Sequence, residues 1–382
     1  MKVLLVGGGS GGHITPLLAV AHKLRSSHHK AEIAYVIEKG SKFDNLPRAS
    51  KDIDKVYTIR AGKFRRYHGE SFLSHVFDIR TNLKNFRDFF YFIAGFFQSF
   101  RLLGGLRPEV VFIKGGFVGV PVGLACRARR IPYFTHDSDT VPGLANRLIA
   151  GGAYCHAVGM PAEFYSYPEA KTEYTGIPLN KAYQHVSSAD KKKFRTDLKL
   201  PAEALVMTVT GGSLGAERLN KALAAVAESL LTSFPKLYIL HQTGAEDSVY
   251  SGLSSDLADR VREVAFTDDL AALTGAADLV VARAGATTIA ELAVQGKACL
   301  LVPNPQLTGG QQTRNAEYLE QHQAAVIVLE EQAALRAIFE KSLADLLSSA
   351  DQRRQLAGNI AKLAKPDAAQ ALTAIIEEIT QK

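Results

Sequence analysis

Two glycine-rich segments carry the residue types that bind phosphate. Residues 7–13 read Gly-Gly-Gly-Ser-Gly-Gly-His, and residues 211–216 read Gly-Gly-Ser-Leu-Gly-Ala. Each follows a short apolar run typical of a buried strand, at residues 3–6 and 206–210, and each leads into a helix-like stretch. Backbone N–H groups and the positive dipole end at a helix N-terminus attract phosphate. The sequence therefore predicts two phosphate-binding loops in two nucleotide-binding folds.

The first loop allows two interpretations. Gly7, Gly9 and Gly12 fit the pattern G-x-G-x-x-G. Glu38 follows the next predicted strand, where a dinucleotide-binding oxidoreductase has its ribose-binding acid. His13 favours other chemistry, because the positive end of the helix lowers the pKa of its imidazole, and a neutral imidazole accepts a proton. His13 is therefore a candidate general base; the alternative is that it caps or packs against the loop.

Polar residues also follow two further predicted strands. The segment 114–117 reads Lys-Gly-Gly-Phe, and the segment 135–139 reads Thr-His-Asp-Ser-Asp. Open α/β sheets bind ligands at the carboxyl ends of their strands. These residues are accordingly either site residues or helix caps, and Asp139 in particular suits an N-cap.

A small-residue turn and a pair of amides stand out in the second half. Residues 282–291 read Ala-Arg-Ala-Gly-Ala-Thr-Thr-Ile-Ala-Glu. Such a turn can expose N–H groups to a diphosphate, while the Glu291 carboxylate can bind both hydroxyls of a ribose. Gln311 and Gln312 begin another predicted helix, and their amides can hydrogen-bond sugar hydroxyls. The alternative for this amide pair is a plain polar helix start.

The elements that position these residues alternate between strand and helix, which is typical of α/β proteins with parallel sheets. Strands are predicted at residues 3–6, 33–37, 110–113, 133–135, 206–210, 237–241, 279–281, 299–302 and 325–329. A chain of 382 residues has room for two domains of ordinary size. We predict two Rossmann-like domains facing each other across a cleft, residues 1–178 and 179–382, with a C-terminal helix able to pack back on the first.

Composition indicates a globular protein, with 47% hydrophobic and 22% charged residues. The N-terminus reads as a strand rather than a signal peptide, and three cysteines without metal or disulfide spacing favour a reducing cytoplasm. Residues 1–180 hold 24 Lys+Arg against 14 Asp+Glu, a charge of +10, whereas residues 181–382 hold 21 against 24, a charge of −3. The asymmetry predicts an anionic partner for the first half, although a solvated basic face would give the same numbers.

A phenylalanine-rich stretch lies in this basic half. Phe89, Phe96 and Phe97 fall at helical spacing, with Lys84 and Arg87 beside them. The run from 89 to 97 is too short to span a bilayer. We predict an interfacial helix whose aromatic side chains enter an anionic membrane surface; the alternative is a buried helix of the first domain.

The motifs, in their order along the chain, are similar to those of the MurG family. They are Gly-Gly-Gly-Ser-Gly-Gly-His-Ile-Thr-Pro, Gly-Gly-Phe-Val, His-Asp-Ser-Asp-Thr-Val-Pro-Gly-Leu-Ala-Asn-Arg, Gly-Gly-Ser-Leu-Gly-Ala, Arg-Ala-Gly-Ala-Thr-Thr-Ile-Ala-Glu-Leu and Gln-Gln-Thr-Arg-Asn-Ala. The resemblance runs from residue 1 to about residue 330. It implies a GT-B glycosyltransferase of family 28 that moves GlcNAc from UDP-GlcNAc to lipid I with inversion, giving lipid II for peptidoglycan. It also implies a peripheral enzyme at the cytoplasmic face of the membrane, a polyprenyl-diphosphate-linked acceptor, no nucleic acid, no cofactor and no metal.

The resemblance assigns roles to individual positions. It implies that Ser10, Gly11, Gly12 and Ser213 lie in loops contacting the donor, and that the main chain at Thr267 holds the uracil. It implies that the nucleotide is surrounded by the segment Ala286, Thr287, Thr288, Ile289, Ala290 and Glu291, with Glu291 on the ribose. Gln311 and Gln312 would contact the GlcNAc hydroxyls, and His13 matches a loop histidine considered as the base.

Two positions depart from the family pattern. Asp139 stands where the family usually has asparagine, and Asn180 where it usually has arginine. A gained anion and a lost cation near a diphosphate weaken its binding unless other residues compensate. Asp139 is therefore a second candidate for the base. A UDP-GlcNAc 2-epimerase-like isomerase, a transferase with another lipid acceptor, an oxidoreductase and a non-catalytic sugar-nucleotide-binding protein remain alternatives.

Overall fold

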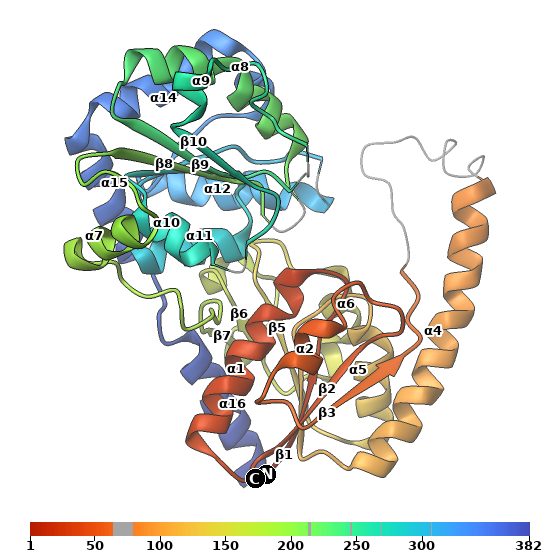
Figure 1. The fold of residues 1–382 in the computed structure, drawn as a ribbon. Helices are drawn as coiled ribbons and strands as arrows, with labels where there is room; N and C mark the ends of the chain where they lie inside the picture. The colour runs from red at the N-terminus through yellow and green to blue at the C-terminus, as the bar shows by residue number, and fades with distance from the viewer. Residues whose placement is uncertain (64–78, 213–214, 245–246, 268, 307) are drawn as a thin grey trace. The chain divides into compact units, whose positions relative to one another are not determined.

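The computed structural model describes residues 1–382 except 64–78, 213–214, 245–246, 268 and 307, and leaves out the side chains of 79–84 and 308. The chain forms two compact units (Figure 1). Unit 1 comprises residues 1–181 and 365–382, and unit 2 comprises residues 182–364. The predicted boundary after residue 178 falls just before this division. The predicted second domain, 179–382, differs from unit 2 because the last helix of the chain belongs to unit 1.

Unit 1 is built on a parallel sheet of seven strands in the order β3-β2-β1-β4-β5-β6-β7. Its strands are β1 (Lys2–Val6), β2 (Glu32–Glu38), β3 (Lys55–Ile59), β4 (Val110–Ile113), β5 (Tyr133–Asp137), β6 (His156–Val158) and β7 (Thr172–Tyr174). Its α-helices are α1 (Thr15–Ser27), α2 (Asn45–Ala49), α4 (Ile79–Leu106), α5 (Gly119–Arg129), α6 (Leu144–Ile149) and α16 (Ala368–Gln381). Short 3-10 helices are η1 (Gly11–His13), η2 (Ala150–Gly152), η3 (Ala162–Phe164) and η4 (Glu169–Lys171).

Unit 2 repeats this plan with six parallel strands in the order β10-β9-β8-β11-β12-β13. The strands are β8 (Leu205–Thr210), β9 (Leu237–Gln242), β10 (Val261–Val264), β11 (Leu279–Ala282), β12 (Cys299–Leu301) and β13 (Val326–Ile327). The helices are α7 (Ser188–Asp197), α8 (Glu217–Ser233), α9 (Ser255–Ala258), α10 (Leu270–Ala276), α11 (Ala286–Gln295), α12 (Gln311–Gln321), α13 (Glu330–Ala333), α14 (Arg336–Ser348) and α15 (Ala350–Lys362), with η5 (Thr308–Gly310) before α12. Two parallel-sheet α/β units confirm the predicted fold class.

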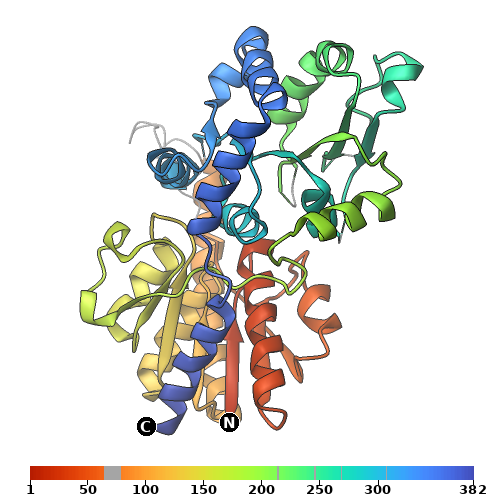
Figure 2. The ribbon, with the colours of Figure 1, turned by 90° about the vertical axis from the view of Figure 1, so that its left-hand side faces the viewer.

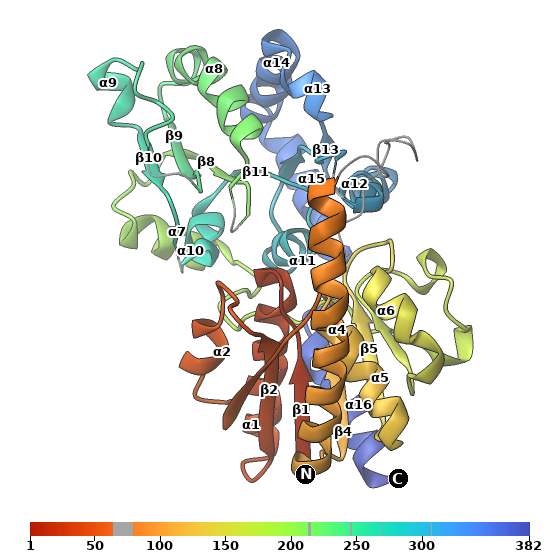
Figure 3. The same cartoon turned by 90° about the vertical axis from the view of Figure 1, so that its right-hand side faces the viewer.

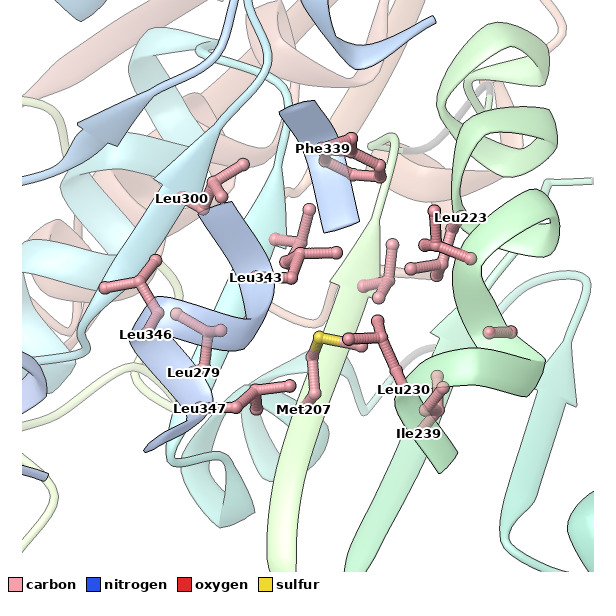
Figure 4. Close-up of a cluster of buried hydrophobic side chains, with 14 of the residues drawn as sticks. Met207, Leu223, Leu230, Ile239, Leu279, Leu300, Phe339, Leu343, Leu346 and Leu347 are labelled. Carbon is pink, nitrogen blue, oxygen red and sulfur yellow. The ribbon is translucent and has the colours of Figure 1, made fainter. Parts of the chain in front are cut away.

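Both faces of each sheet are covered, which explains why the strands read as continuous apolar runs. In β1, Val3 and Leu5 pack toward α1 and α16, whereas Leu4 and Val6 pack toward α4 and α5. This alternation follows from the two-residue period of a strand. In unit 2 the larger apolar cluster joins one face of the sheet to α8 and α14, and Figure 4 shows Met207 and Leu279 meeting helix residues such as Leu343.

The C-terminal helix returns to unit 1. Figures 1 and 2 show α16 beside α1, with the two chain ends close together. Leu372 and Ile376 of α16 are fully buried in the cluster that includes Leu17. At the surface, His28 Nε2 lies 2.6 Å from a carboxylate oxygen of Glu377. The apolar face of α16 therefore completes the core of unit 1.

The two strand orders place the functional loops. In both sheets the order reverses beside the first strand, between β1 and β4 and between β8 and β11. Ligands of open α/β sheets bind outside the carboxyl ends of the strands at such a reversal. The loop at 7–13 follows β1, and the loop at 211–216 follows β8. Each predicted phosphate loop therefore lies at the reversal point of its own sheet.

Candidate active site

The first glycine loop is held by a carboxylate from the neighbouring strand. Glu38 Oε1 accepts a hydrogen bond of 3.0 Å from the backbone N–H of Gly9, which has a φ of +83°. A Cβ added at Gly8 would lie 1.9 Å from Glu38 Oε2. The close approach of Glu38 therefore leaves no space for a side chain at position 8. Glu38 is the residue on which the dinucleotide interpretation depended. One of its carboxylate oxygens instead accepts a hydrogen bond from the loop backbone.

His13 lies at the end of this loop with one ring nitrogen engaged. Its Nδ1 is 3.0 Å from the carbonyl oxygen of Gly8 and 3.4 Å from Ser10 Oγ. A carbonyl only accepts, so Nδ1 carries the proton in the neutral ring and Nε2 keeps a free lone pair. Burial, reinforced by the charge of Lys114, lowers the pKa of His13 to about 4. The imidazole is therefore neutral near pH 7 and able to accept a proton at Nε2.

The cause of this neutrality differs from the one predicted. The sequence argument invoked the dipole of the following helix, but His13 ends the three-residue helix η1, and α1 begins only at Thr15. Burial and a neighbouring cation lower the pKa instead. The direction of the shift is the one predicted, and burial is its largest cause.

A buried lysine, which the sequence placed within the candidate segment 114–117 without giving it a role, is a functional group of this site. Lys114 follows β4 and is 2% exposed, and its Nζ donates a hydrogen bond of 2.7 Å to Ser138 Oγ just beyond β5. Burial lowers the pKa of Lys114 to about 8, and the carboxylates of Asp137 and Asp139 oppose that shift. Its position after a buried strand was the signal available, because parallel strands direct such residues to the ligand-binding edge.

Asp137 and Asp139 make different contacts near Lys114. Asp137 accepts hydrogen bonds of 2.8 Å from the Gly143 N–H and from the Tyr167 hydroxyl, so it caps a turn. Burial raises the pKa of Asp137. Asp139 is half-buried, its backbone carbonyl accepts from Tyr165, and its charge acts on Lys114. The structure thus brings both candidate bases, His13 and Asp139, within the electrostatic reach of one ammonium group.

In unit 2 the predicted ribose-binding acid lies on the first turns of α11. This helix begins at Ala286 after Gly285, immediately beyond β11. The half-buried Glu291 carboxylate receives a hydrogen bond from the hydroxyl of Tyr183, a residue that the sequence argument did not single out. Burial raises the pKa of Glu291 to about 8, and the Tyr183 hydrogen bond opposes the rise. Glu291 therefore favours its neutral form near pH 7 in the free protein.

The amide pair follows a glycine turn. Gly309 and Gly310 have φ values of +75° and +67°, and α12 begins at Gln311. Gln312 Oε1 accepts a hydrogen bond of 2.8 Å from the N–H of Asn304, which fixes the amide and directs its NH₂ group away from that contact. Gln311 is half-buried at the helix start. One amide is therefore oriented by the protein, and both lie at the carboxyl edge of the sheet.

The remaining predicted residues divide between the units. Thr267 follows β10, and its hydroxyl accepts a hydrogen bond of 3.0 Å from the Asp269 N–H. Residues 286–291 follow β11, so they share with Thr267, Gln311 and Gln312 the carboxyl edge of the unit 2 sheet. Ser213 lies outside the described residues. Ser10, Gly11, Gly12, His13, Asp139 and Asn180 all belong to unit 1.

A buried ion pair supports the turn that precedes α11. Arg283, which begins that turn, is bonded to the carboxylate of Glu330 and donates a hydrogen bond of 3.1 Å to the Val302 carbonyl. Both side chains of the ion pair are at least 90% buried. Asn315 Nδ2 donates to the Ala284 carbonyl at 3.1 Å. The turn is therefore fixed from two sides by side chains remote in sequence.

The predicted membrane patch lies on α4, the long orange helix of unit 1 in Figure 3. Phe86, Phe89, Phe90 and Phe97 are 64%, 48%, 53% and 65% exposed. Phe96 is half-buried and packs against the core cluster that contains Leu103, so its assignment to the exposed patch was wrong. The Lys84 side chain lies outside the description.

This helix is longer than the aromatic run indicated. The helix over residues 85–106, whose most apolar 18-residue window has a mean hydropathy of 1.3, is long and apolar enough, by length and composition alone, to cross a membrane. The expectation that the run is too short to span concerned residues 89–97 alone, which form only part of this helix. The Leu103 end of the helix nevertheless packs in the unit 1 core, while the Phe86 end is exposed.

Basic residues lie beside the exposed phenylalanines. Arg87 lies 3.0 Å from the Asp88 carboxylate, and its guanidinium stacks over Tyr91. Arg87 also lines a pocket of about 330 Å³ with Lys39, Arg60 and Lys63. Aromatic and cationic groups therefore share one surface of unit 1.

The two parallel-sheet α/β units, with loops at the carboxyl edges of both sheets, place the chain in the GT-B fold class. The structure of MurG from Acinetobacter baumannii has a TM-score of 0.72 with this chain at 24% identity and covers 99% of both chains. UDP-GlcNAc 2-epimerase from Neisseria meningitidis bound to UDP-GlcNAc has a TM-score of 0.65 at 12% identity, covering 99% of this chain and 100% of that one.

The chain belongs to glycosyltransferase family 28. The family's N-terminal domain matches residues 3–158 and its C-terminal domain matches residues 206–372. A relative in Geotalea uraniireducens is 33% identical over 100% of this chain and 98% of its own length. A relative in Geobacter sulfurreducens is 31% identical over 100% of both. Both are described as UDP-N-acetylglucosamine–N-acetylmuramyl-(pentapeptide) pyrophosphoryl-undecaprenol N-acetylglucosamine transferases. Membership confirms the predicted family.

Proposed function

We propose that this protein is an inverting hexosyltransferase that moves GlcNAc from UDP-GlcNAc to polyprenyl-diphosphate-linked MurNAc-pentapeptide, lipid I, giving lipid II for peptidoglycan. The observation that carries the proposal is similarity over the full chain, at 33% identity, to transferases whose names state this donor and acceptor. The loops at the carboxyl edges of both sheets are the parts such a reaction needs.

Donor recognition would use the carboxyl edge of the unit 2 sheet. Glu291 would accept hydrogen bonds from the ribose hydroxyls, and the N–H groups of Ala286 to Thr288, which precede the first intrahelical bond of α11 at Ile289, would face the diphosphate. The main chain at Thr267 would hold the uracil, and Ser213 would contact the donor from the second glycine loop. Gln311 and Gln312 would hydrogen-bond the hydroxyls of GlcNAc.

The chemical step is a direct displacement at the anomeric carbon. The acceptor hydroxyl oxygen forms the new bond to that carbon, the bond to the β-phosphate oxygen breaks, and its electron pair leaves with UDP. The acceptor proton passes to His13 Nε2 or to the Asp139 carboxylate. Fixed N–H dipoles in the glycine loops would stabilise the charge that develops on UDP. We propose that this step needs no metal ion or other cofactor.

The acceptor remains in the bilayer, so the enzyme must reach the membrane surface. We propose peripheral binding to the cytoplasmic face through α4. The support is the exposed side chains of Phe86, Phe89 and Phe97 beside the cations that include Arg87. Aromatic side chains enter the headgroup region, and cations attract anionic lipid.

The test uses purified protein and labelled UDP-GlcNAc, with and without a lipid I analogue, in buffer with and without EDTA. Release of UDP that depends on the acceptor and survives EDTA is the expected result. Formation of a sugar-nucleotide isomer without acceptor would instead favour an epimerase, and donor binding without turnover would favour a non-catalytic protein. Loss of activity in EDTA with recovery on adding Mg²⁺ would refute the metal-free step alone.

A further inference from the structure

A second charged cavity lies in unit 2, at the opposite edge of the sheet from Glu291 and Gln311. It has a volume of about 300 Å³ and is lined by Ser187, Lys191, Asp278, Lys297, Arg353 and Arg354, among others. Asp278 directly precedes β11, and Lys297 lies just before β12, so the cavity borders the amino ends of the strands. The donor site described above lies at their carboxyl ends. The two sites are therefore separate within one unit.

Positive charge predominates in this cavity. The two carboxylate oxygens of Asp278 lie 2.6 Å from Lys191 Nζ and 2.6 Å from Arg195 Nη2, so one carboxylate forms ion pairs with two cations. Lys297 is 6% exposed, and its Nζ donates to the carbonyls of Gly275 at 2.6 Å and Ala277 at 3.3 Å. Carbonyl oxygens satisfy these hydrogen bonds but carry no net charge. The ammonium of Lys297 is thus bonded without being neutralised.

The same holds for the arginines of α15. Arg353 donates to the carbonyls of Leu346 and Leu347 at the end of α14, again without meeting a carboxylate. Arg354 is bonded to Asp351, with both side chains strongly exposed. Five cations in or beside the cavity, Lys191, Arg195, Lys297, Arg353 and Arg354, therefore face three carboxylates, those of Asp278, Asp351 and Asp190, the last bonded to the lining residue Ser187.

The effect of this imbalance is visible at Lys297. Burial lowers the pKa of Lys297 to about 7; the charges of Lys191 and Arg195 lower it further, and Asp278 opposes the shift. Burial is the larger cause, and the neighbouring cations add a smaller positive potential to it. An anion in the cavity would relieve that potential.

Two helices also begin at the cavity. Helix α7 begins at Ser188, and α15 begins at Ala350, both of which line the cavity. The N-terminus of a helix carries a partial positive charge and favours anions. Arg353 and Arg354 lie within the first turns of α15, where cations are disfavoured. Both helix starts are already capped, α7 by Ser187 and Asp190 and α15 by Ser349, so the side-chain cations of the cavity, and not the helix dipoles, carry the preference for an anion.

We propose that this cavity binds a small phosphate-bearing anion, with Lys191, Lys297 and Arg354 as its charged contacts. Lysine ammonium groups and arginine guanidinium groups are the usual protein partners of phosphate, and the arginine fork can bind two of its oxygens. The competing explanation is that the cations serve only to hold α7 and α15 against the sheet. The site differs from the donor site and does not depend on the proposed transferase activity.

The test is calorimetric titration of the full chain with inorganic pyrophosphate and, separately, inorganic phosphate, at constant ionic strength and in the presence of saturating UDP. UDP occupies the donor site, so any remaining saturable binding reports a second site. The variants are Arg354→Gln, which alters an exposed side chain, and the double variant Lys191→Gln/Arg354→Gln. Lys341→Gln is the matched control, because Lys341 is an exposed cation on α14 outside the cavity.

The expected result is saturable pyrophosphate binding at millimolar concentration or below that survives UDP. Arg354→Gln should weaken it several-fold and the double variant at least tenfold, while Lys341→Gln leaves it unchanged. Unchanged melting temperatures of the variants without ligand would show that folding is preserved. Complete displacement of pyrophosphate by UDP, or equal affinities in the wild type and the double variant, would overturn the proposal.

Discussion

The Nζ atom of Lys114 lies 2.7 Å from Ser138 Oγ and joins the residue after β4 to the residue after β5. This contact fixes an ammonium group, 2% exposed, within the electrostatic reach of the imidazole of His13. A buried cation costs free energy unless other groups compensate. Here the hydroxyl of Ser138 and the charges of Asp137 and Asp139 do so. Lys114 thus determines the electrostatic environment of both candidate bases.

Replacing Lys114 by methionine should raise the pKa of His13, because the lysine charge contributes to the low value of about 4. The folded-state pKa lies below the ordinary value of 6.5. The contribution of His13 to stability is therefore complete above pH 6.5 and lost as pH falls through 4. In Lys114→Met the folded-state pKa of His13 moves closer to 6.5, so the pH range over which this stability is lost becomes narrower at its acid end. NMR titration of the His13 ring measures the shift; an unchanged pKa, as expected for the exposed control Lys51→Met, would contradict the argument.

The two candidate bases can be separated by kinetics. Removing a general base lowers kcat by about 10²–10⁴-fold, whereas removing a neighbour that only tunes it costs less. If His13 is the base, His13→Ala shows the larger loss. The free-enzyme acid limb of kcat/KM then falls near pH 4, in keeping with the pKa of about 4, and not near 6.5. A larger loss in Asp139→Asn, with His13→Ala retaining most activity, would assign the base to Asp139.

Glu291→Gln should stabilise the free protein while weakening UDP binding. Burial raises the pKa of Glu291 from 4.5 to about 8. The stability that its neutral form contributes is present below pH 4.5 and lost as pH rises through 8. The variant keeps a neutral group at all pH values, so it should gain on the order of 2–4 kcal/mol at pH 8–9. Urea unfolding at pH 5 and pH 9 measures this gain.

The binding half of that prediction has its own control. At pH 9, above the Glu291 pKa of about 8, the wild type presents a carboxylate, which is a better acceptor for ribose hydroxyls than an amide, so the UDP affinity of Glu291→Gln measured there should be lower by about tenfold or more. Glu317→Gln changes an exposed carboxylate of α12 and should leave affinity and stability unchanged. Wild-type UDP affinity in Glu291→Gln would remove Glu291 from the ribose site.

The parts that sequence patterns predicted are those encoded locally. The strands at 33–37 and 110–113 were recognised because parallel strands buried on both faces are apolar throughout. The glycine loops were recognised because phosphate contact needs small residues next to a helix start. Gly9 and Gly212 do have positive φ values, +83° and +82°, which other residues adopt at a cost.

The parts that sequence patterns missed depend on residues far apart in the chain. Lys114 resembles any surface lysine until the strand order places it beside Ser138, 24 residues later. The Tyr183 hydroxyl reaches Glu291 from the start of unit 2, and no spacing rule connects them. Phe96 has the same residue type as Phe97, and only the packing of α4 buries one more than the other. Tertiary contacts decided each of these cases.

Membrane binding should depend on the exposed aromatic residues of α4 and on salt. The triple variant Phe86→Ser/Phe89→Ser/Phe97→Ser should lose most of its binding to vesicles containing anionic lipid, since its side chains supply the buried apolar area. Raising the salt concentration should weaken wild-type binding, because the cations act through electrostatic attraction. Vesicle co-sedimentation measures both effects.

The matched control for this patch is Leu148→Ser, which alters an apolar side chain of unit 1 that is 59% exposed but lies on α6. It should bind vesicles as the wild type does. Each variant should retain its UDP affinity, because none of the residues assigned to donor binding lies on α4 or α6. Equal partitioning of the triple variant and the wild type would show that α4 is not the membrane-binding surface.

The ion pair between Arg283 and Glu330 should dominate the stability of the turn before α11. Glu330→Ala leaves the guanidinium of Arg283 buried without its carboxylate, an arrangement that costs about 3–5 kcal/mol. Arg218 binds the same carboxylate at 2.8 Å but is 62% exposed, so Arg218→Ala should cost no more than about 1 kcal/mol. Hydrogen exchange of unit 2 amides in increasing urea measures both changes.

The double variant Arg283→Met/Glu330→Leu removes both charges and should recover much of the loss. Equal destabilisation by Glu330→Ala and Arg218→Ala would show instead that the exposed contact contributes as much as the buried one.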